Sequence, residues 1–213
     1  HKIILHFQTH VTGHEAQSSQ QQRGDSAVMV AGRLINWLGE RQRANAAEAD
    51  PNCTFEPPYS TLHCGVVHGG TAHNITARDC SFVTDIRSLP GEDPNTYLAE
   101  YEAFVREVVE PEMRAICPDT SIVIDVHANV PGFDESESAE AVQLAKHLSG
   151  QNAVEVVPYA AESGQFQQAE FSVAMCGPGS IDQAHQPNEF ISIAQLDEGT
   201  EFMRRLIDFQ STD

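Results

Sequence analysis

The stretch Thr61-Leu62-His63-Cys64-Gly65-Val66-Val67 alternates, with Leu62, Cys64 and Val66 on one side. A period of two is typical of a β-strand that buries one face. Gly69-Gly70 then turns the chain, and residues 75–86 return as a second strand with apolar side chains on a common face. These two segments predict an antiparallel hairpin, around which the rest of the first half can be arranged.

The segments on either side of this hairpin complete a recognisable order of elements. Lys2–Thr12 is rich in Ile, Phe, Thr and Val and predicts a strand. A helix follows over Ser26–Arg43, capped by Asp25 or Ser26, and Asp93-Pro94 opens a second helix that extends to Ile116. Residues 121–126 form a last β-rich run. The order strand, helix, strand, strand, helix, strand predicts a ferredoxin-like βαββαβ fold of the α/β (α+β) class, with a four-stranded antiparallel sheet covered by two helices.

A proline inside the second helix and a change of pattern after Pro131 bear on how the chain is divided. Pro111 lies inside the second helix, where the missing N–H and the ring are expected to kink or interrupt it. After Pro131 the pattern changes to a helix at 138–148, short strands at 154–157 and 171–175, and a helix at 193–209. The sequence therefore predicts a domain over residues 1–130 and a separate α/β segment over residues 131–213.

Composition excludes several classes of partner. The 213 residues carry 12 Lys and Arg against 31 Asp and Glu, a formal net charge of −19. Such a surface repels phosphate backbones and anionic membranes, so we expect neither nucleic acid nor a membrane as a partner. Five cysteines without a C-x-x-C pair favour reduced thiols in the cytoplasm. The chain opens on His1 and soon enters a strand-like run, which suggests a piece of a longer protein.

A glycine-rich loop near the C-terminus is the strongest candidate for a ligand site. Gly177-Pro178-Gly179 predicts a tight backbone that can approach a ligand closely, and His185 follows six residues later. Neutral imidazole is a common donor to zinc-like cations, so His185 is a candidate metal ligand. The alternative is a loop histidine with no ligand.

Several short motifs follow one another across nearly the whole chain. They lie at residues 11–19 (Val-Thr-Gly-His-Glu-Ala-Gln-Ser-Ser), 69–75 (Gly-Gly-Thr-Ala-His-Asn-Ile), 85–87 (Asp-Ile-Arg), 161–167 (Ala-Glu-Ser-Gly-Gln-Phe-Gln) and 177–185 (Gly-Pro-Gly-Ser-Ile-Asp-Gln-Ala-His). Together they resemble the acetylornithine deacetylase family of dinuclear metallohydrolases, which is related to succinyl-diaminopimelate desuccinylase, aminoacylase and carboxypeptidase G.

This resemblance implies a role for each half of the chain. The first half would be the lid, or dimerisation, domain of a homodimer, and the second half a C-terminal segment of a metallopeptidase-like catalytic domain. His185 would bind one of two metal ions, zinc or cobalt, and Glu162 would lie beside the substrate. His14 would stabilise the tetrahedral oxyanion, and Asn74 and Arg87 would bind the substrate's α-carboxylate or the oxyanion region.

Each of these residues also has a structural interpretation. Asn74 is as well suited to a turn before a strand as to a ligand, and Glu162 to a surface turn. Arg87 is either a surface charge or a bidentate carboxylate clamp, which a guanidinium is shaped to be. The lid loop carries Gln17 where relatives commonly have histidine, so His14 takes that role or the site is impaired.

The family's remaining metal ligands and its general base precede the lid, and these residues do not contain them. We expect the intact enzyme to hydrolyse the amide of N2-acetyl-L-ornithine, an N-acyl amino acid, to acetate and L-ornithine, as in arginine biosynthesis. We expect the 213 residues alone to be inactive. The alternatives are another N-acyl-amino-acid amidohydrolase, such as a desuccinylase or an aminoacylase, and a non-catalytic dimerisation module.

Overall fold

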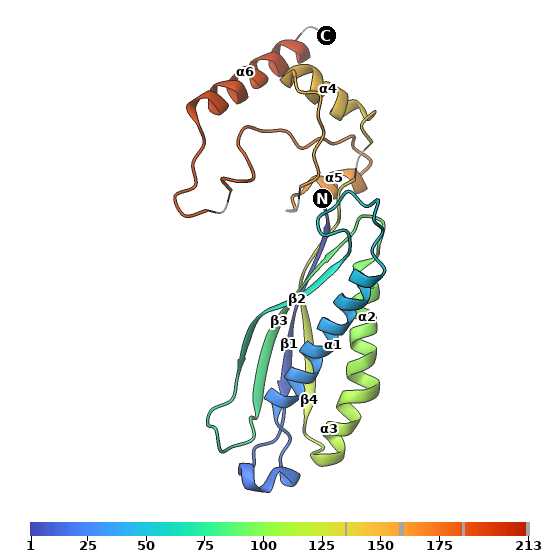
Figure 1. Ribbon diagram of the computed structural model, residues 1–213, viewed down its shortest axis with the longest axis vertical. Coiled ribbons are helices and arrows are strands. Elements are labelled where there is room, and N and C mark those ends of the chain that lie inside the picture. The colour runs from blue at the N-terminus through green and yellow to red at the C-terminus, as the bar shows by residue number, and fades with distance from the viewer. Residues whose placement is uncertain (135, 158–159, 185, 212–213) are drawn as a thin grey trace. The chain divides into compact units, whose positions relative to one another are not determined.

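The computed structural model describes residues 1–134, 136–157, 160–184 and 186–211, and divides into two compact units (Figure 1). The first unit comprises His1–Phe133 and Val156–Ala161. The second unit comprises Asp134–Glu155 and Glu162–Asp213.

The first unit is built on a four-stranded antiparallel sheet. Its strands are β1 (Ile3–Thr12), β2 (Thr61–Gly69), β3 (Asp79–Ser88) and β4 (Ser121–Val130), in the spatial order β2-β3-β1-β4. Every neighbouring pair is antiparallel. This order, with helices between β1 and β2 and between β3 and β4, confirms the predicted ferredoxin-like fold.

Helices cover one face of this sheet and leave the other open (Figure 1). They are α1 (Ala27–Ala47), α2 (Pro94–Phe104) and α3 (Glu110–Ile116). Along β1, residues alternate between buried and more exposed, so Leu5 and Phe7 face the helices while His6 and His10 face away. Apolar side chains of the sheet and helices form one core there, in which Thr9 Oγ1 lies 3.0 Å from Tyr101 Oη. Burial raises the pKa of the Tyr101 phenol, so it stays protonated and able to donate.

Pro111 does not interrupt the second helix. A single π-helical turn, η2 (Val105–Val109), lies between α2 and α3, and the Glu110 N–H donates to Val105 O, five residues earlier. Since proline lacks an N–H and crowds the carbonyl four residues before it, a wider turn just upstream accommodates it without ending the helix. The predicted Asp93 cap does form, with its side chain accepting from Asn95 N at 2.9 Å.

Two details of the predicted hairpin were wrong. β3 begins at Asp79, because Ile75 instead forms an isolated bridge with Gln17 in the loop after β1. The register between β2 and β3 shifts between Cys64 and Val66, where Gly65 is the extra residue. Because a bulge reverses the inside–outside alternation, Val66 lies opposite Val83 and is exposed instead of continuing the apolar face of Leu62 and Cys64.

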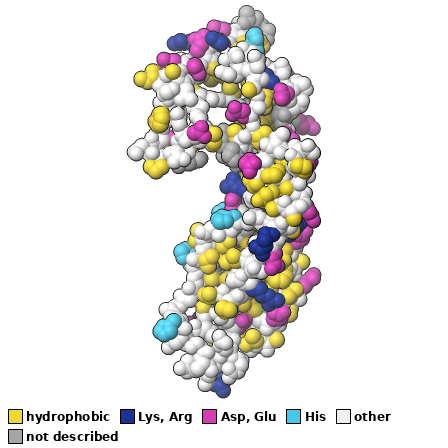
Figure 2. Space-filling view, in the orientation of Figure 1, with side chains coloured by type: hydrophobic (Ala, Val, Ile, Leu, Met, Phe, Trp, Pro, Cys, Tyr) yellow, Lys and Arg dark blue, Asp and Glu magenta, His cyan; other side chains and the backbone are white. Residues whose placement is uncertain are grey.

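The second unit contains helices α4 (Glu140–Ser149), α5 (Ser163–Gln168) and α6 (Ile193–Gln210). The helices predicted at 138–148 and 193–209 are therefore present. The strands predicted at 154–157 and 171–175 are not formed, because a strand needs a backbone partner and neither segment pairs with a strand in the described part of the chain. Many of its large apolar side chains, Phe171, Phe190 and Ile193 among them, remain at the surface, and Figure 2 shows hydrophobic side chains on its visible face.

Candidate functional site

His14 lies in a loop whose backbone is fixed by hydrogen bonds to Asp25 and Thr76. It follows the end of β1 and exchanges two backbone hydrogen bonds with Asp25, at 2.8 and 3.0 Å. Its carbonyl also accepts from Thr76 Oγ1 at 2.9 Å. The residue itself is exposed. His14 is therefore exposed to solvent on a fixed backbone.

The glycine before His14 allows this close packing. A Cβ on Gly13 would lie 2.1 Å from Asp25 O and 2.9 Å from Ala27 N, both of which are backbone atoms. Any larger side chain would push the loop away from the start of α1. The Gly-His pair is thus a structural requirement for this position of His14, whatever the imidazole does.

Asn74 lies in the loop between β2 and β3, and this loop is tied to the one that carries His14. Asn74 O accepts from Ser18 N at 2.9 Å, and Thr76 N donates to Ala16 O at 2.8 Å. Thr76 Oγ1 also accepts from Ala16 N at 2.6 Å. The structure therefore brings the His14 and Asn74 segments together at one end of the sheet, although they are 60 positions apart in sequence.

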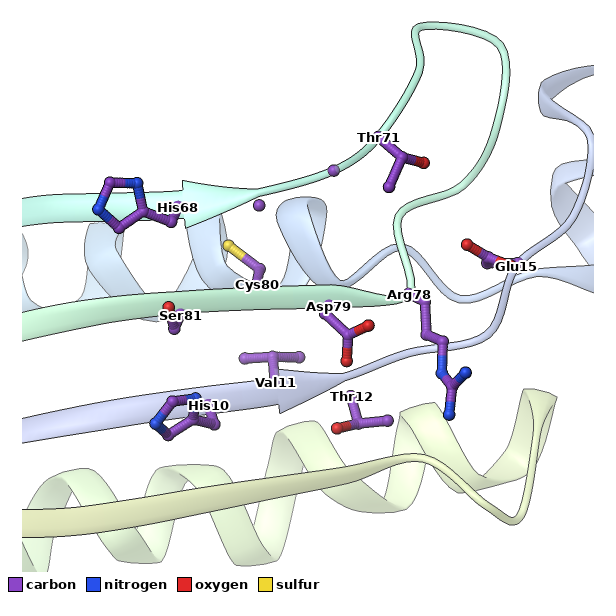
Figure 3. A pocket seen from close by; sticks show the side chains of 12 residues that line it. His10, Val11, Thr12, Glu15, His68, Thr71, Arg78, Asp79, Cys80 and Ser81 are labelled. Atoms are coloured by element: carbon purple, nitrogen blue, oxygen red, sulfur yellow. The ribbon is translucent and has the colours of Figure 1, made fainter.

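A hollow of about 340 Å³ lies at this end of the sheet, between the ends of β1, β2 and β3 (Figure 3). Its charged and imidazole side chains are His10, Glu15, His68, Arg78 and Asp79. Both signs of charge therefore occur in it. The sequence does not predict this hollow, because its residues come together only after the strands pair. The signal that could have found it is the clustering of polar residues at three successive strand ends.

Arg87 lies near the opposite end of β3, where it is paired with Ile4 of β1 and Thr61 of β2. Its Nε donates to Asp85 Oδ2 at 2.9 Å, and both side chains are about one-third exposed, at 36% and 34%. Since Asp85 and Arg87 are two residues apart in a strand, they share a face, and the open-face histidine His6 lies directly across from Asp85.

The length of β3 separates Arg87 from the His14 end of the sheet. Arg87 lies eight positions along β3 from Asp79, which is at the end near His14, and at 3.3 Å per residue this is about 26 Å. An N-acyl amino acid spans far less than this. His14 and Arg87 of one chain therefore lie at opposite ends of β3, farther apart along the backbone than a small substrate is long.

The remaining candidates lie in the second unit. Glu162 is the N-cap of α5, and its carbonyl accepts from Gln165 N at 3.0 Å. The next residue, Ser163, contacts Met175, since its Oγ lies 3.4 Å from the Met175 sulfur. Glu162 and the loop that contains Gly177 are thus neighbouring segments. Gly177 is exposed and a Cβ there would meet no atom within 4 Å, so the space around it is open. His185 lies outside the described residues.

The described residues do not fit a metal ion by themselves. Among them, no group of three or more His, Cys, Asp or Glu side chains is close enough to hold a metal ion. A zinc or cobalt site normally uses three or four protein ligands. In the same described part of the chain, no helix is long and apolar enough to cross a membrane.

Comparison with known proteins identifies the family to which this sequence is similar. Residues 1–113 match the peptidase dimerisation domain of the M20 family. The chain belongs to the M20 family. M20 proteins are metal-dependent amidohydrolases and peptidases, and the resemblance found in the sequence is confirmed at this level.

Curated M20 relatives extend the match to the second unit. The chain is 32% identical to acetylornithine deacetylase from Photorhabdus laumondii over 98% of its own length and 52% of the relative's. It is also 32% identical to acetylornithine deacetylase from Proteus mirabilis, again over 98% of this chain and 52% of the relative. The chain thus spans about half the length of the curated relatives it matches.

A solved structure supports the fold. Aminopeptidase PepT from Bacillus cereus aligns with a TM-score of 0.68 at 18% identity, covering 96% of this chain and 51% of that one. Identity this low bears on the fold alone.

Proposed function

We propose that these residues are the lid and the C-terminal catalytic segment of an M20 amidohydrolase that removes the acyl group from N-acyl amino acids, with N2-acetyl-L-ornithine as the preferred substrate. The observation that carries the proposal is the 32% identity to acetylornithine deacetylases across 98% of the chain. Zinc or cobalt would be held mainly by residues outside this chain, with His185 as its one contribution, and the site would operate in the cytoplasm.

Each candidate residue would have its own role in this reaction. His14, fixed through its backbone and exposed through its ring, is suited to donate a hydrogen bond to the developing oxyanion. Asn74 lies at the same end and would support that role with its amide. Arg87, at the other end of β3, would bind the α-carboxylate, because a guanidinium can offer two parallel N–H groups. Glu162 and the open backbone at Gly177 would line the substrate from the second unit.

The separation of His14 and Arg87 supports a homodimer with shared active sites. If one chain cannot bring both residues to one substrate, a partner's lid can supply the missing histidine. Two identical chains related by a twofold axis would then hold two complete sites, each with residues from both. This account gives the dimerisation domain a chemical role as well as an architectural one.

The test is hydrolysis by the full-length protein that contains these residues. Purified protein with added zinc or cobalt is incubated with N2-acetyl-L-ornithine, N-succinyl-diaminopimelate and N-acetyl-methionine, and the free amine is quantified. We expect the highest kcat/KM on N2-acetyl-L-ornithine. A preference for the succinylated or methionine substrate would favour the desuccinylase or aminoacylase alternative. No hydrolysis of any of the three, with a folded dimer, would favour the non-catalytic module.

A further inference from the structure

The open face of the sheet carries a fixed ion pair around Arg87. Asp85 and Arg87 lie on β3, which is paired on both sides, so the backbone of each is held by neighbouring strands. The bond from Arg87 Nε to Asp85 Oδ2, at 2.9 Å, uses the inner edge of the guanidinium. A planar guanidinium held at Nε presents its two terminal nitrogens outward, which is the edge that binds a carboxylate with two hydrogen bonds.

Histidines flank Asp85 across both neighbouring strands. His6 of β1 and His63 of β2 are its direct cross-strand partners on the open face. Directly opposite residues in an antiparallel pair have Cβ atoms about 5 Å apart, so both histidines are immediate neighbours of Asp85 on this face. The backbone at position 85 is thus held by both neighbouring strands, and its carboxylate accepts from Arg87 Nε, so that Asp85 can orient Arg87.

We propose that Asp85 is a positioning residue, which fixes the guanidinium of Arg87 so that its outer edge receives the α-carboxylate of an N-acyl amino acid. This rests on the proposed function, since it presumes that Arg87 binds that carboxylate. Asp85 does not touch the substrate in this account.

The pairing also has an electrostatic cost. A carboxylate beside Arg87 cancels part of the positive charge that attracts the substrate. If charge alone mattered, removing Asp85 would tighten substrate binding. If orientation matters more, removing it would weaken binding, because the freed guanidinium must lose side-chain freedom when the substrate arrives. The two effects have opposite signs, so a mutation can separate them.

The experiment measures steady-state kinetics of the full-length protein on N2-acetyl-L-ornithine. We expect Asp85→Ala to raise KM about twofold to fivefold, the range that a partly exposed ion pair supports, with kcat nearly unchanged. Asp85→Asn keeps an acceptor oxygen and should restore KM most of the way to the wild-type value. Arg87→Ala should raise KM about tenfold or more, and Asp85→Ala should add nothing to it, because the two residues act as one unit.

Asp125→Asn is the matched control. Asp125 is another exposed carboxylate on the sheet, but it lies on β4 opposite Gln8 and faces His10 at 3.9 Å, away from Arg87. The Asp125→Asn substitution removes the same charge as Asp85→Ala and should leave KM unchanged. On the α-carboxamide analogue of the substrate, Asp85→Ala should have no effect. Thermal unfolding of each variant checks that the lid is intact.

The outcomes distinguish this inference from the proposed function. A wild-type protein that hydrolyses no N-acyl amino acid would remove both. A KM that rises in Arg87→Ala but stays level or falls in Asp85→Ala would overturn only the positioning role. An equal effect of Asp85→Ala and Asp125→Asn would attribute the change to general surface charge and would also overturn it.

Discussion

Glu110 is a carboxylate inside the first unit whose side chain is only 5% exposed, in a chain that carries most of its acids at the surface. Its oxygens accept from Ile122 N at 3.0 Å, from Arg106 Nη1 at 2.6 Å and from Arg114 Nη2 at 3.2 Å. Arg106 in turn donates to Ile122 O at 2.7 Å. This network ties α3 to the start of β4, so it replaces apolar packing at one corner of the core.

Glu110→Ala should therefore destabilise the fold by about 1–3 kcal/mol, because it leaves the buried N–H of Ile122 without its acceptor and removes the carboxylate that pairs with Arg106 and Arg114. Urea unfolding followed by circular dichroism measures the change. Glu112→Ala is the control, since Glu112 pairs with Arg33 on the exposed side of the same helix. It should cost far less. Similar losses in both variants would contradict the role given to the buried network.

Asp25 is a second buried acid, at the start of α1 beside His14. Burial raises the pKa of its carboxyl above the ordinary 3.8, and no donor in the described part of the chain lies within hydrogen-bond distance of its Oδ2. An acid whose folded pKa is raised contributes most to stability below its unfolded pKa. That contribution is lost as the pH rises through the folded value.

Asp25→Asn, which has no charge to bury, should therefore be more stable than the wild type at neutral pH. The difference should shrink as the pH falls through the raised pKa and vanish below about 3.8. Urea midpoints of both proteins at a series of pH values measure this. An advantage that is the same at every pH, or that grows toward acid, would show that the carboxyl is not desolvated in the folded state.

Among the elements, the two edge strands of the sheet differ in what they offer a partner. β2 exposes Val67, and the adjoining helix α1 exposes Val28 and Met29, so an apolar surface continues from strand to helix. β4 also exposes Val123 and Val126, but it carries the charged Asp125 beside them, and a charge on an edge strand discourages pairing. We infer that the proposed homodimer forms through β2 and α1.

Val67→Lys should consequently shift the protein from dimer to monomer at low micromolar concentration, as measured by sedimentation velocity. Val126→Lys on β4 is closely matched, because both valines are 49% exposed on edge strands. It should leave the dimer intact. A monomer produced only by Val126→Lys would place the interface on the β4 edge, and a monomeric wild type would remove the homodimer itself.

The sequence predicts those elements whose determinants lie within a few residues of one another. The helices and the order of strands follow from apolar periodicity and cap residues such as Asp93, which act within a few positions. The bulge at Gly65 and the π turn before Pro111 depend on how a strand or helix packs on its neighbours, so the local pattern could not show them. The strands expected at 154–157 and 171–175 failed for the related reason that a strand is defined by its partner.

The candidate site shows the same division. His14, Asn74 and Arg87 could be selected from motifs, but their separation along β3 could not, because it depends on strand register and direction. The Asp85–Arg87 pair follows from alternation once the strand is assigned. The mixed-charge hollow lined by Arg78 and Asp79 required the folded ends of three strands.

At the scale of the whole molecule, the second unit leaves many large apolar side chains exposed. Helix α6 exposes Ile193, Leu196, Met203 and Ile207, which a unit complete in itself would bury. The curated relatives are about twice as long as this chain, which leaves room for a segment that packs there and brings further metal ligands. The lid and the second unit would then act only as parts of that larger enzyme.

The 213 residues alone should therefore bind zinc weakly and hydrolyse no N2-acetyl-L-ornithine, whereas the full-length protein should do both. In the full-length protein His185→Ala should remove most activity and lower the bound zinc, measured by metal analysis after dialysis. Full activity after His185→Ala would exclude His185 from the metal site. Deacetylation by the 213 residues with added zinc or cobalt would show that the ligands lie within them.

We expect His14 and Arg87 to reach one substrate only from two different chains. His14→Ala should lower kcat, and Arg87→Ala should raise KM, so each pure homodimer is impaired. In a heterodimer of the two variants, one site keeps Arg87 from one chain and His14 from the other, and the second site loses both. Purified heterodimers, separated by different affinity tags, should then regain about half of the wild-type activity with a wild-type KM. Heterodimers no more active than the two parent homodimers would show that both residues act within one chain, and would contradict the shared-site account.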